Sequence, residues 1–134
     1  MESLKVNITL PVSAEILYNA WLNSKEHTAF TGAPAKASNK VNGKFTAWDD
    51  YIRGKNIELI PTKKIVQTWR SIEFDEDAPD SILELTFEEK RDSTTLHLHH
   101  YHLQKGDAKK YTDGWKESYF EPMKSYFNSQ KTNK

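Results

Sequence analysis

The chain has 134 residues, the length of one ordinary domain, and can bury enough surface to fold without a disulfide or a structural metal. Its apolar fraction is a lean 37%, so four Trp, six Tyr and six Phe must supply much of the core. Nineteen basic residues balance nineteen acidic ones, and the absence of cysteine excludes disulfides, thiolate nucleophiles and cysteine-ligated zinc. We therefore expect a cytoplasmic domain whose partner is neither nucleic acid nor a membrane.

Residues 4–10 alternate apolar with polar side chains, the period of a half-buried strand, and Pro11 ends the alternation. Ser13 can cap the helix that follows, since its hydroxyl can accept a hydrogen bond from a free amide of the first turn. A second short helix is expected from Ser24 until Gly32 interrupts it. The chain thus opens with one strand and two short helices.

A long stretch rich in β-branched and aromatic residues follows, and turn signals divide it into strands. Asn42–Gly43 favours a two-residue hairpin because both residues tolerate positive φ, and Asp49–Asp50 marks another turn. The acid-rich segment 73–80, which contains Pro79, is expected to be a solvated loop. The expected strands are 44–48, 51–60, 63–72, 81–88 and 94–103.

The last part of the chain has a helical period after Gly106, with aromatic residues recurring at intervals of three and four. Asp107 can cap this long helix, and Pro122 should kink it because proline removes one backbone hydrogen bond. The order of the elements predicts an α+β fold, with a single domain over residues 1–128 and a frayed tail over 129–134.

Several short segments occur in the order and at the spacing of a known family. They are Gly43-Lys44-Phe45, Gly54, Glu58-Leu59-Ile60-Pro61, Lys64-Ile65-Val66, Trp69-Arg70, Leu83-Glu84-Leu85-Thr86-Phe87, Gly114-Trp115, Tyr119-Phe120-Glu121 and Lys124. Together they resemble the C-terminal domain of the activators of heat-shock protein 90 ATPase, a branch of the START-like, pollen-allergen-like (SRPBCC) superfamily. The resemblance spans nearly the whole chain.

The resemblance implies a helix-grip fold, in which a curved antiparallel sheet of about six or seven strands wraps the long C-terminal helix. It also implies a protein-interaction role toward a chaperone of the Hsp90 class, without a cofactor. Arg70 and the acidic residues Glu76 and Asp77 are the candidate partner contacts, although the acidic segment also fits an ordinary solvated loop. Asp50 stands where the family usually has glycine, so this turn must reach positive φ at a small cost.

Four histidines crowd the strand 94–103. His97 and His99 share one face about 7 Å apart, a spacing that can chelate zinc or copper. The alternating leucines of the strand favour another interpretation, in which His100 and His102 line the core or a cavity and the other two meet solvent. A catalytic metal site would need a third ligand, and the only other histidine, His27, lies on a different element, so no metal site is expected.

Aromatic residues and a flexible methionine could line an apolar ligand pocket between sheet and helix, or they could simply be core. Two of them, Trp21 and Phe30, would then lie at the pocket mouth. The best candidate pair for acid–base chemistry is His100 or His102 facing Tyr119, and a satisfied buried hydrogen bond is the alternative. The candidate cavity residues are Trp21, Phe30, Trp48, Trp69, His100, His102, Trp115, Tyr119 and Met123.

Three functions remain open at this point. The first is a non-enzymatic interaction module for an Hsp90-class chaperone. The second is a carrier or sensor of a small apolar ligand, and the third is a cyclase or isomerase that uses the cavity histidines. Binding is favoured over catalysis because no acid, base and orienting group occur together in the sequence.

Overall fold

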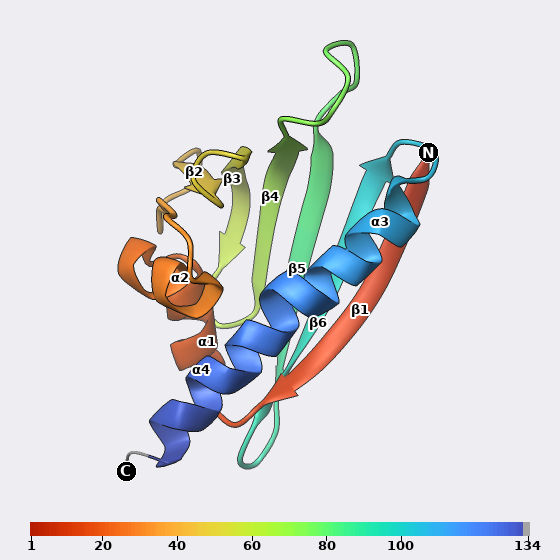
Figure 1. The fold of residues 1–134 in the computed structure, drawn as a ribbon. Helices are drawn as coiled ribbons and strands as arrows, with labels where there is room; N and C mark the ends of the chain where they lie inside the picture. The colour runs from red at the N-terminus through yellow and green to blue at the C-terminus, as the bar shows by residue number, and fades with distance from the viewer. Residues whose placement is uncertain (133–134) are drawn as a thin grey trace.

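Six antiparallel strands form one curved sheet in the computed structural model, which describes residues 1–132 (Figure 1). The strands lie in the order β1-β6-β5-β4-β3-β2, so the first and last strands of the chain are neighbours and the others form a meander. Their bounds are β1 Glu2–Leu10, β2 Lys44–Ala47, β3 Ile52–Ile60, β4 Lys64–Ser71, β5 Ser81–Glu89 and β6 Thr94–Leu103.

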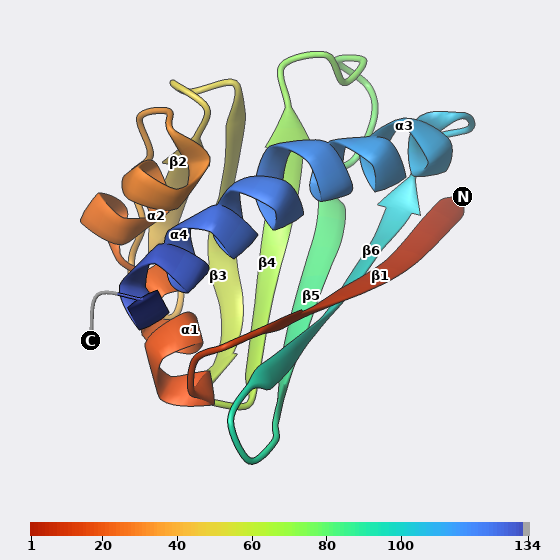
Figure 2. The ribbon, with the colours of Figure 1, turned by 60° about the horizontal axis from the view of Figure 1, so that its bottom comes forward.

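One long C-terminal helix lies across a face of this sheet (Figure 2). It consists of α3 (Asp107–Gly114), a π-helical segment η1 (Trp115–Phe120) and α4 (Glu121–Thr132). Two short helices, α1 (Ala14–Trp21) and α2 (Ser24–Thr31), follow β1 and lie beside the C-terminal half of the long helix. This is the helix-grip architecture that the sequence predicted, with the core between sheet and helices.

Side chains cap the first turns of two helices, one from the adjacent residue and one from a distant part of the chain. The Ser13 hydroxyl accepts a hydrogen bond from an amide of the first turn of α1 at 3.2 Å, as predicted. At the start of α3, however, Asp107 is not the cap. The Glu2 carboxylate accepts hydrogen bonds from the amides of Gly106 and Ala108, both at 3.1 Å, and these bonds lower the pKa of Glu2. The cap thereby joins the first strand to the last helix.

The predicted irregularity at Pro122 takes the form of the π-helical segment directly before it. The amide of Glu121 bonds to the carbonyl of Lys116, five residues back instead of four. Proline has no amide hydrogen and its ring crowds the preceding turn, so a wider turn there relieves both constraints. Helix α4 then continues to Thr132, within the span predicted as a frayed tail, and residues 133–134 lie outside the described part of the chain.

The wider turn also sets which side chains face the sheet. Trp115, Tyr119, Met123 and Phe127 recur every four residues, and all are at least 94% buried, with exposures of 3%, 6%, 0% and 0%. In a regular α-helix each step of four overshoots a full turn by about 40°, so such a stripe would drift away from the sheet. The wider turn of η1, in which a hydrogen bond reaches five residues back instead of four, offsets this drift.

The prediction of a hairpin at Asn42–Gly43 is wrong. Asn42 has a φ of 69°, but its amide bonds to the carbonyl of Asn56 at 2.8 Å, and no strand precedes it among residues 32–41. The two-residue turn instead joins β2 to β3, where Asp49 and Asp50 adopt φ values of 55° and 69°. The positive φ expected at Asp50 is thus confirmed.

Candidate functional site

An open apolar pocket of about 390 Å³ lies between the long helix and the β2–β3 side of the sheet. Aromatic rings form most of its wall, and the lining residues, all within the described part of the chain, include no charged side chain. A pocket of this size and polarity matches a small apolar ligand or a single apolar side chain. It is lined by Trp48, Tyr51, Ile52, Trp69, Tyr111, Gly114, Trp115, Ser118 and Tyr119.

The β2–β3 turn places one wall of the pocket. Trp48 begins this turn with a φ of 56°, a left-handed conformation that is costly for a large side chain. The strained backbone turns the indole toward the helix, where it meets the Tyr119 ring edge to face at 5.9 Å. Tyr51 ends the same turn and also lines the pocket.

The opposite wall comes from the helix and from β4. Trp69 projects inward from β4 and lies 5.1 Å from the Tyr111 ring and 5.9 Å from the Trp115 ring. Trp115 in turn lies 4.7 Å from Tyr119, one helical turn further on. Each of these rings is fixed by two or more others, so the wall is preformed.

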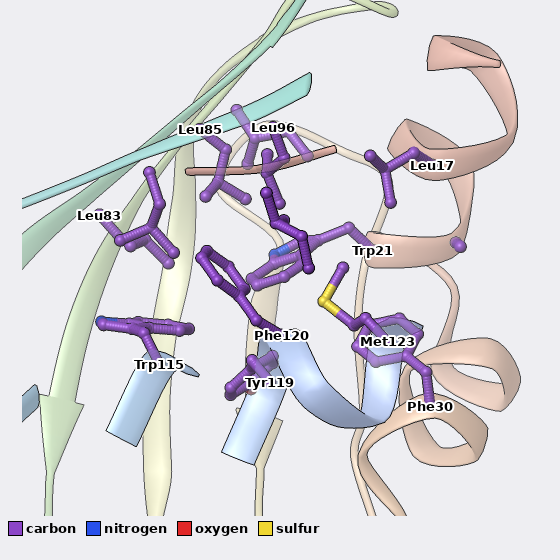
Figure 3. Packing of buried hydrophobic residues seen from close by; sticks show 14 of the residues in the cluster. Leu17, Trp21, Phe30, Leu83, Leu85, Leu96, Trp115, Tyr119, Phe120 and Met123 are labelled. Carbon is purple, nitrogen blue, oxygen red and sulfur yellow. The ribbon is translucent and has the colours of Figure 1, made fainter. Parts of the chain in front are cut away.

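Trp21, Phe30 and Met123 do not line this pocket. They are 3%, 1% and 0% exposed and pack together with Phe120 in the interior behind it (Figure 3). The prediction that Trp21 and Phe30 lie at the pocket mouth is therefore wrong. Helix α1 packs Trp21 against Trp115 and Tyr119 of η1, and helix α2 packs Phe30 against Tyr126 and Phe127 of α4.

A fully satisfied hydrogen-bond network holds His100 behind the pocket wall. Its Nδ1 accepts from the indole nitrogen of Trp115 at 3.1 Å, and its Nε2 lies 2.8 Å from the Ser81 hydroxyl. That hydroxyl donates to the carbonyl of Trp69 at 2.7 Å, so Nε2 carries the proton and donates to Ser81. Burial, with a smaller effect from neighbouring His99, lowers the pKa of His100 to about 3. The ring is a neutral link between two pocket residues.

The predicted pairing of His100 with Tyr119 is wrong, because the Tyr119 hydroxyl bonds to His27 Nε2 at 3.1 Å. Nδ1 of His27 donates to the carbonyl of Trp21 at 2.9 Å, which leaves Nε2 free to accept from the tyrosine. Burial lowers the pKa of His27 to about 4 and raises that of Tyr119 far above its usual range. Alternation along one strand could not reveal His27, which comes from helix α2.

His102 faces solvent, contrary to the prediction that it lines the cavity. The pairing of β1 with β6 slips between Glu2 and Leu4, and His102 adopts a φ of 61° at this bulge. The alternation of inner and outer faces breaks there, so Leu103 is buried in its place, with an exposure of 0%.

His97 and His99 lie on the outer face of the sheet. Nε2 of His97 is 2.9 Å from the Glu88 carboxylate, and this bond lowers the pKa of Glu88. Within the described residues, no group of three or more histidines, aspartates or glutamates is placed to hold a metal ion. In this part of the chain, no third such side chain is placed with His97 and His99 to complete a metal centre.

Arg70 organises the acidic β4–β5 loop, residues 72–80. Its guanidinium donates to the carbonyls of Ala78 at 2.7 Å and Asp75 at 2.9 Å, and it forms an ion pair with Asp80 at 3.1 Å. Glu76 and Asp77 are exposed on the same loop, which extends beyond the end of the sheet (Figure 1). Of the predicted partner contacts, Arg70 thus positions the loop, and the side chains of Glu76 and Asp77 are exposed.

Within residues 1–132, no helix is both long enough and apolar enough to cross a membrane. The curved antiparallel sheet and the long C-terminal helix that lies across it define a helix-grip fold. The sequence profile of the family described as "Activator of Hsp90 ATPase homolog 1-like protein" matches residues 11–128. The chain belongs to this family.

Individual relatives agree with this assignment. Activator of 90 kDa heat shock protein ATPase homolog 1 from Homo sapiens is 31% identical over 119 residues, which cover 89% of this chain and 35% of the human protein. The homolog from Dictyostelium discoideum is 27% identical over 128 residues, 95% of this chain and 33% of that protein. The chain therefore spans about a third of the length of these curated relatives.

The crystal structure of an HSP90 activator from Plasmodium falciparum has the same fold. It superposes with a TM-score of 0.86 at 23% sequence identity, covering 96% of this chain and 97% of that one. At this identity the likeness establishes the architecture alone.

Proposed function

We propose that this domain is a non-enzymatic binding module that contacts a chaperone of the Hsp90 class and stimulates its ATPase. The observation that carries the proposal is the family match over residues 11–128, together with the helix-grip fold of an HSP90 activator. The sequence contains no glycine-rich loop of the kind that cradles nucleotide phosphates, so the effect would act on the partner's own ATPase site.

The β4–β5 loop is the proposed contact surface. Arg70 holds the loop backbone in one conformation, which lowers the entropy that would be lost when a partner binds. Glu76 and Asp77 are exposed on it, so they are available to a basic patch on the chaperone. Such rim charges act mainly on the association rate and on its dependence on salt.

The test is the ATPase rate of the purified cognate chaperone with increasing amounts of this chain. We expect stimulation that Asp77→Asn reduces and that Asp92→Asn leaves unchanged, because Asp92 is also exposed but lies in the β5–β6 turn at the opposite end of the sheet. The proposal would be refuted if the chain neither bound the chaperone nor changed its ATPase rate.

A second candidate function is the binding of a small apolar ligand, supported by the uncharged aromatic pocket of about 390 Å³. Native mass spectrometry of freshly purified protein should then show a bound small molecule. Ser118 lines the pocket, so Ser118→Phe should fill it and abolish that species, whereas Ser125→Phe on exposed helix surface should not. Protein that is ligand-free in these spectra and unmoved in a thermal-shift screen of apolar compounds would exclude this function.

An isomerase or cyclase function finds less support in the geometry. His100 and His27 have both ring nitrogens engaged by protein groups, and neither belongs to the pocket lining. A proton carrier must reach the reacting group directly or through one water. His102, the other candidate, is exposed on the bulge.

A further inference from the structure

The outer face of the sheet, away from the long helix, carries a cluster of cations over three adjacent strands. Lys44 on β2 is directly opposite Lys55 on β3, and Arg53 on β3 is directly opposite Arg70 on β4. Paired residues point to the same side of a sheet, and residues two apart on one strand do so as well. The four side chains therefore share one face, which we call the basic face.

This arrangement is unfavourable for the sheet itself, because like charges directly opposite each other destabilise a strand pair. Arg70 has a compensating acid, the Asp80 carboxylate at 3.1 Å. Within the described part of the chain, no carboxylate lies within ion-pair distance of Lys44, Arg53 or Lys55. The formal net charge of zero conceals this local excess.

The basic face is also hollowed. A shallow depression of about 360 Å³ is lined by Lys44, Arg53, Lys55 and Arg70 together with uncharged residues and Asp80. Gly54, between the two cations of β3, also lines the depression. Cations around a depression with few acids create a positive potential that favours an anionic group.

We propose that the basic face binds an acidic segment of a partner protein in an extended conformation. Arg53 and Lys55 are two residues apart on one strand, about 7 Å, which is also the spacing of alternate side chains on an extended peptide. A segment with carboxylates at alternate positions could lie along β3 and meet both cations. Lys44, directly opposite Lys55, would add a second positive charge near one of these carboxylates. The recognition would depend on charge spacing and would be sensitive to salt.

The acidic β4–β5 loop argues against a long polyanion such as nucleic acid in this place. Asp80 lines the depression itself, and Glu76 and Asp77 are exposed on the loop that borders it. These carboxylates would repel a duplex that extends beyond the three strands, whereas a short peptide segment can avoid them.

The proposal does not depend on the chaperone, so its test uses a synthetic probe. A short fluorescent peptide in which glutamate alternates with threonine is titrated with the full chain, and its anisotropy is followed at low salt and at about 0.5 M salt. A peptide with glutamine in place of glutamate is the probe control. We expect saturable binding of the glutamate peptide alone, lost at high salt.

Matched double variants locate the site. Arg53→Gln with Lys55→Gln should weaken binding about tenfold or more, as expected for the loss of two exposed charge pairs. Lys105→Gln with Lys109→Gln removes the same charge from exposed positions at and near the start of α3 and should leave binding unchanged. Neither double variant should lower the unfolding temperature, because the first relieves like-charge repulsion and the second changes solvated side chains.

Three outcomes would overturn the proposal: no binding of the glutamate peptide at low salt, equal weakening by both double variants, or tighter binding of single-stranded DNA or of anionic vesicles than of the peptide. The test is separate from that of chaperone activation. Loss of peptide binding with intact chaperone stimulation, or the reverse, would show which of the two proposals fails.

Discussion

Acid should destabilise this fold well above the pH at which its carboxylates are protonated, because two histidines are buried in the neutral form. Burial lowers the pKa of His27 to about 4 and that of His100 to about 3, whereas both start from 6.5 in the unfolded chain. Between these values the unfolded state binds more protons than the folded state, so stability is fully present above about pH 6.5 and is lost as the pH falls.

The magnitude follows from the size of the shifts. At pH 5 the pH is about 1.5 units below the pKa of the two histidines in the unfolded chain, which are therefore charged, whereas in the folded protein they are still neutral. This difference lowers the free energy of unfolding by roughly 2 kcal/mol for each histidine, or about 4 kcal/mol together. A domain of this size has a total stability of about 5 to 15 kcal/mol, so the unfolding temperature should fall by on the order of 10 °C. The pKa values of the Glu2 and Glu88 carboxylates are lowered in the folded protein, so the stability that these groups contribute is lost only below about pH 4.5, outside this window.

Urea unfolding at several pH values between 5 and 7 measures the effect. The wild-type free energy of unfolding should fall steeply with decreasing pH, and His27→Gln and His100→Gln should each reduce the slope by roughly half while lowering stability at pH 7. His102→Gln is the control, because this exposed residue belongs to neither buried network. A wild-type free energy that stays constant from pH 7 to pH 5 would contradict the assignment of two neutral buried rings.

Other substitutions test single contacts. Tyr119→Phe removes the hydroxyl that donates to His27 and leaves a buried nitrogen unsatisfied, so chemical denaturation should show a loss of about 1–3 kcal/mol. Gly54→Ala would place a methyl group 1.9 Å from the carbonyl oxygen of Thr68, so the variant should be severely destabilised or insoluble. A variant with the wild-type melting temperature would show that β3 can move away from β4 without cost. Arg70→Gln should release the β4–β5 loop and speed its cleavage by a glutamate-specific protease, whereas Arg91→Gln in the β5–β6 turn should not.

The fold could be predicted because its signals are local and mutually consistent. Alternation gave the strands to within one or two residues at most ends, and Ser13 and Gly32 marked helix ends that the structure confirms. The prediction of a hairpin at Asn42–Gly43 was wrong because the same two residues also suit a loop whose backbone bonds to Asn56 on β3. A local signal cannot distinguish between these two uses of positive φ.

The candidate site was harder to predict than the fold, because it is formed by contacts that the alternation of apolar and polar residues along a strand does not reveal. A bulge near the end of β6 reversed the faces, so His102 points outward although it follows the leucine pattern. His27 reaches Tyr119 only because α2 packs on the long helix, a contact between residues far apart in the sequence. The basic face could not be predicted from composition, because Arg53 and Lys55 oppose cations on two other strands and net charge carries no information on strand register.

The most direct test of the proposed function is the steady-state ATPase rate of the cognate Hsp90-class chaperone, measured with this chain, with its Asp77→Asn variant and with its Asp92→Asn variant. We expect saturable stimulation by the wild type and by Asp92→Asn, and weaker stimulation by Asp77→Asn that approaches the wild-type level at high protein concentration. An ATPase rate that stays at its basal level with all three proteins would contradict it.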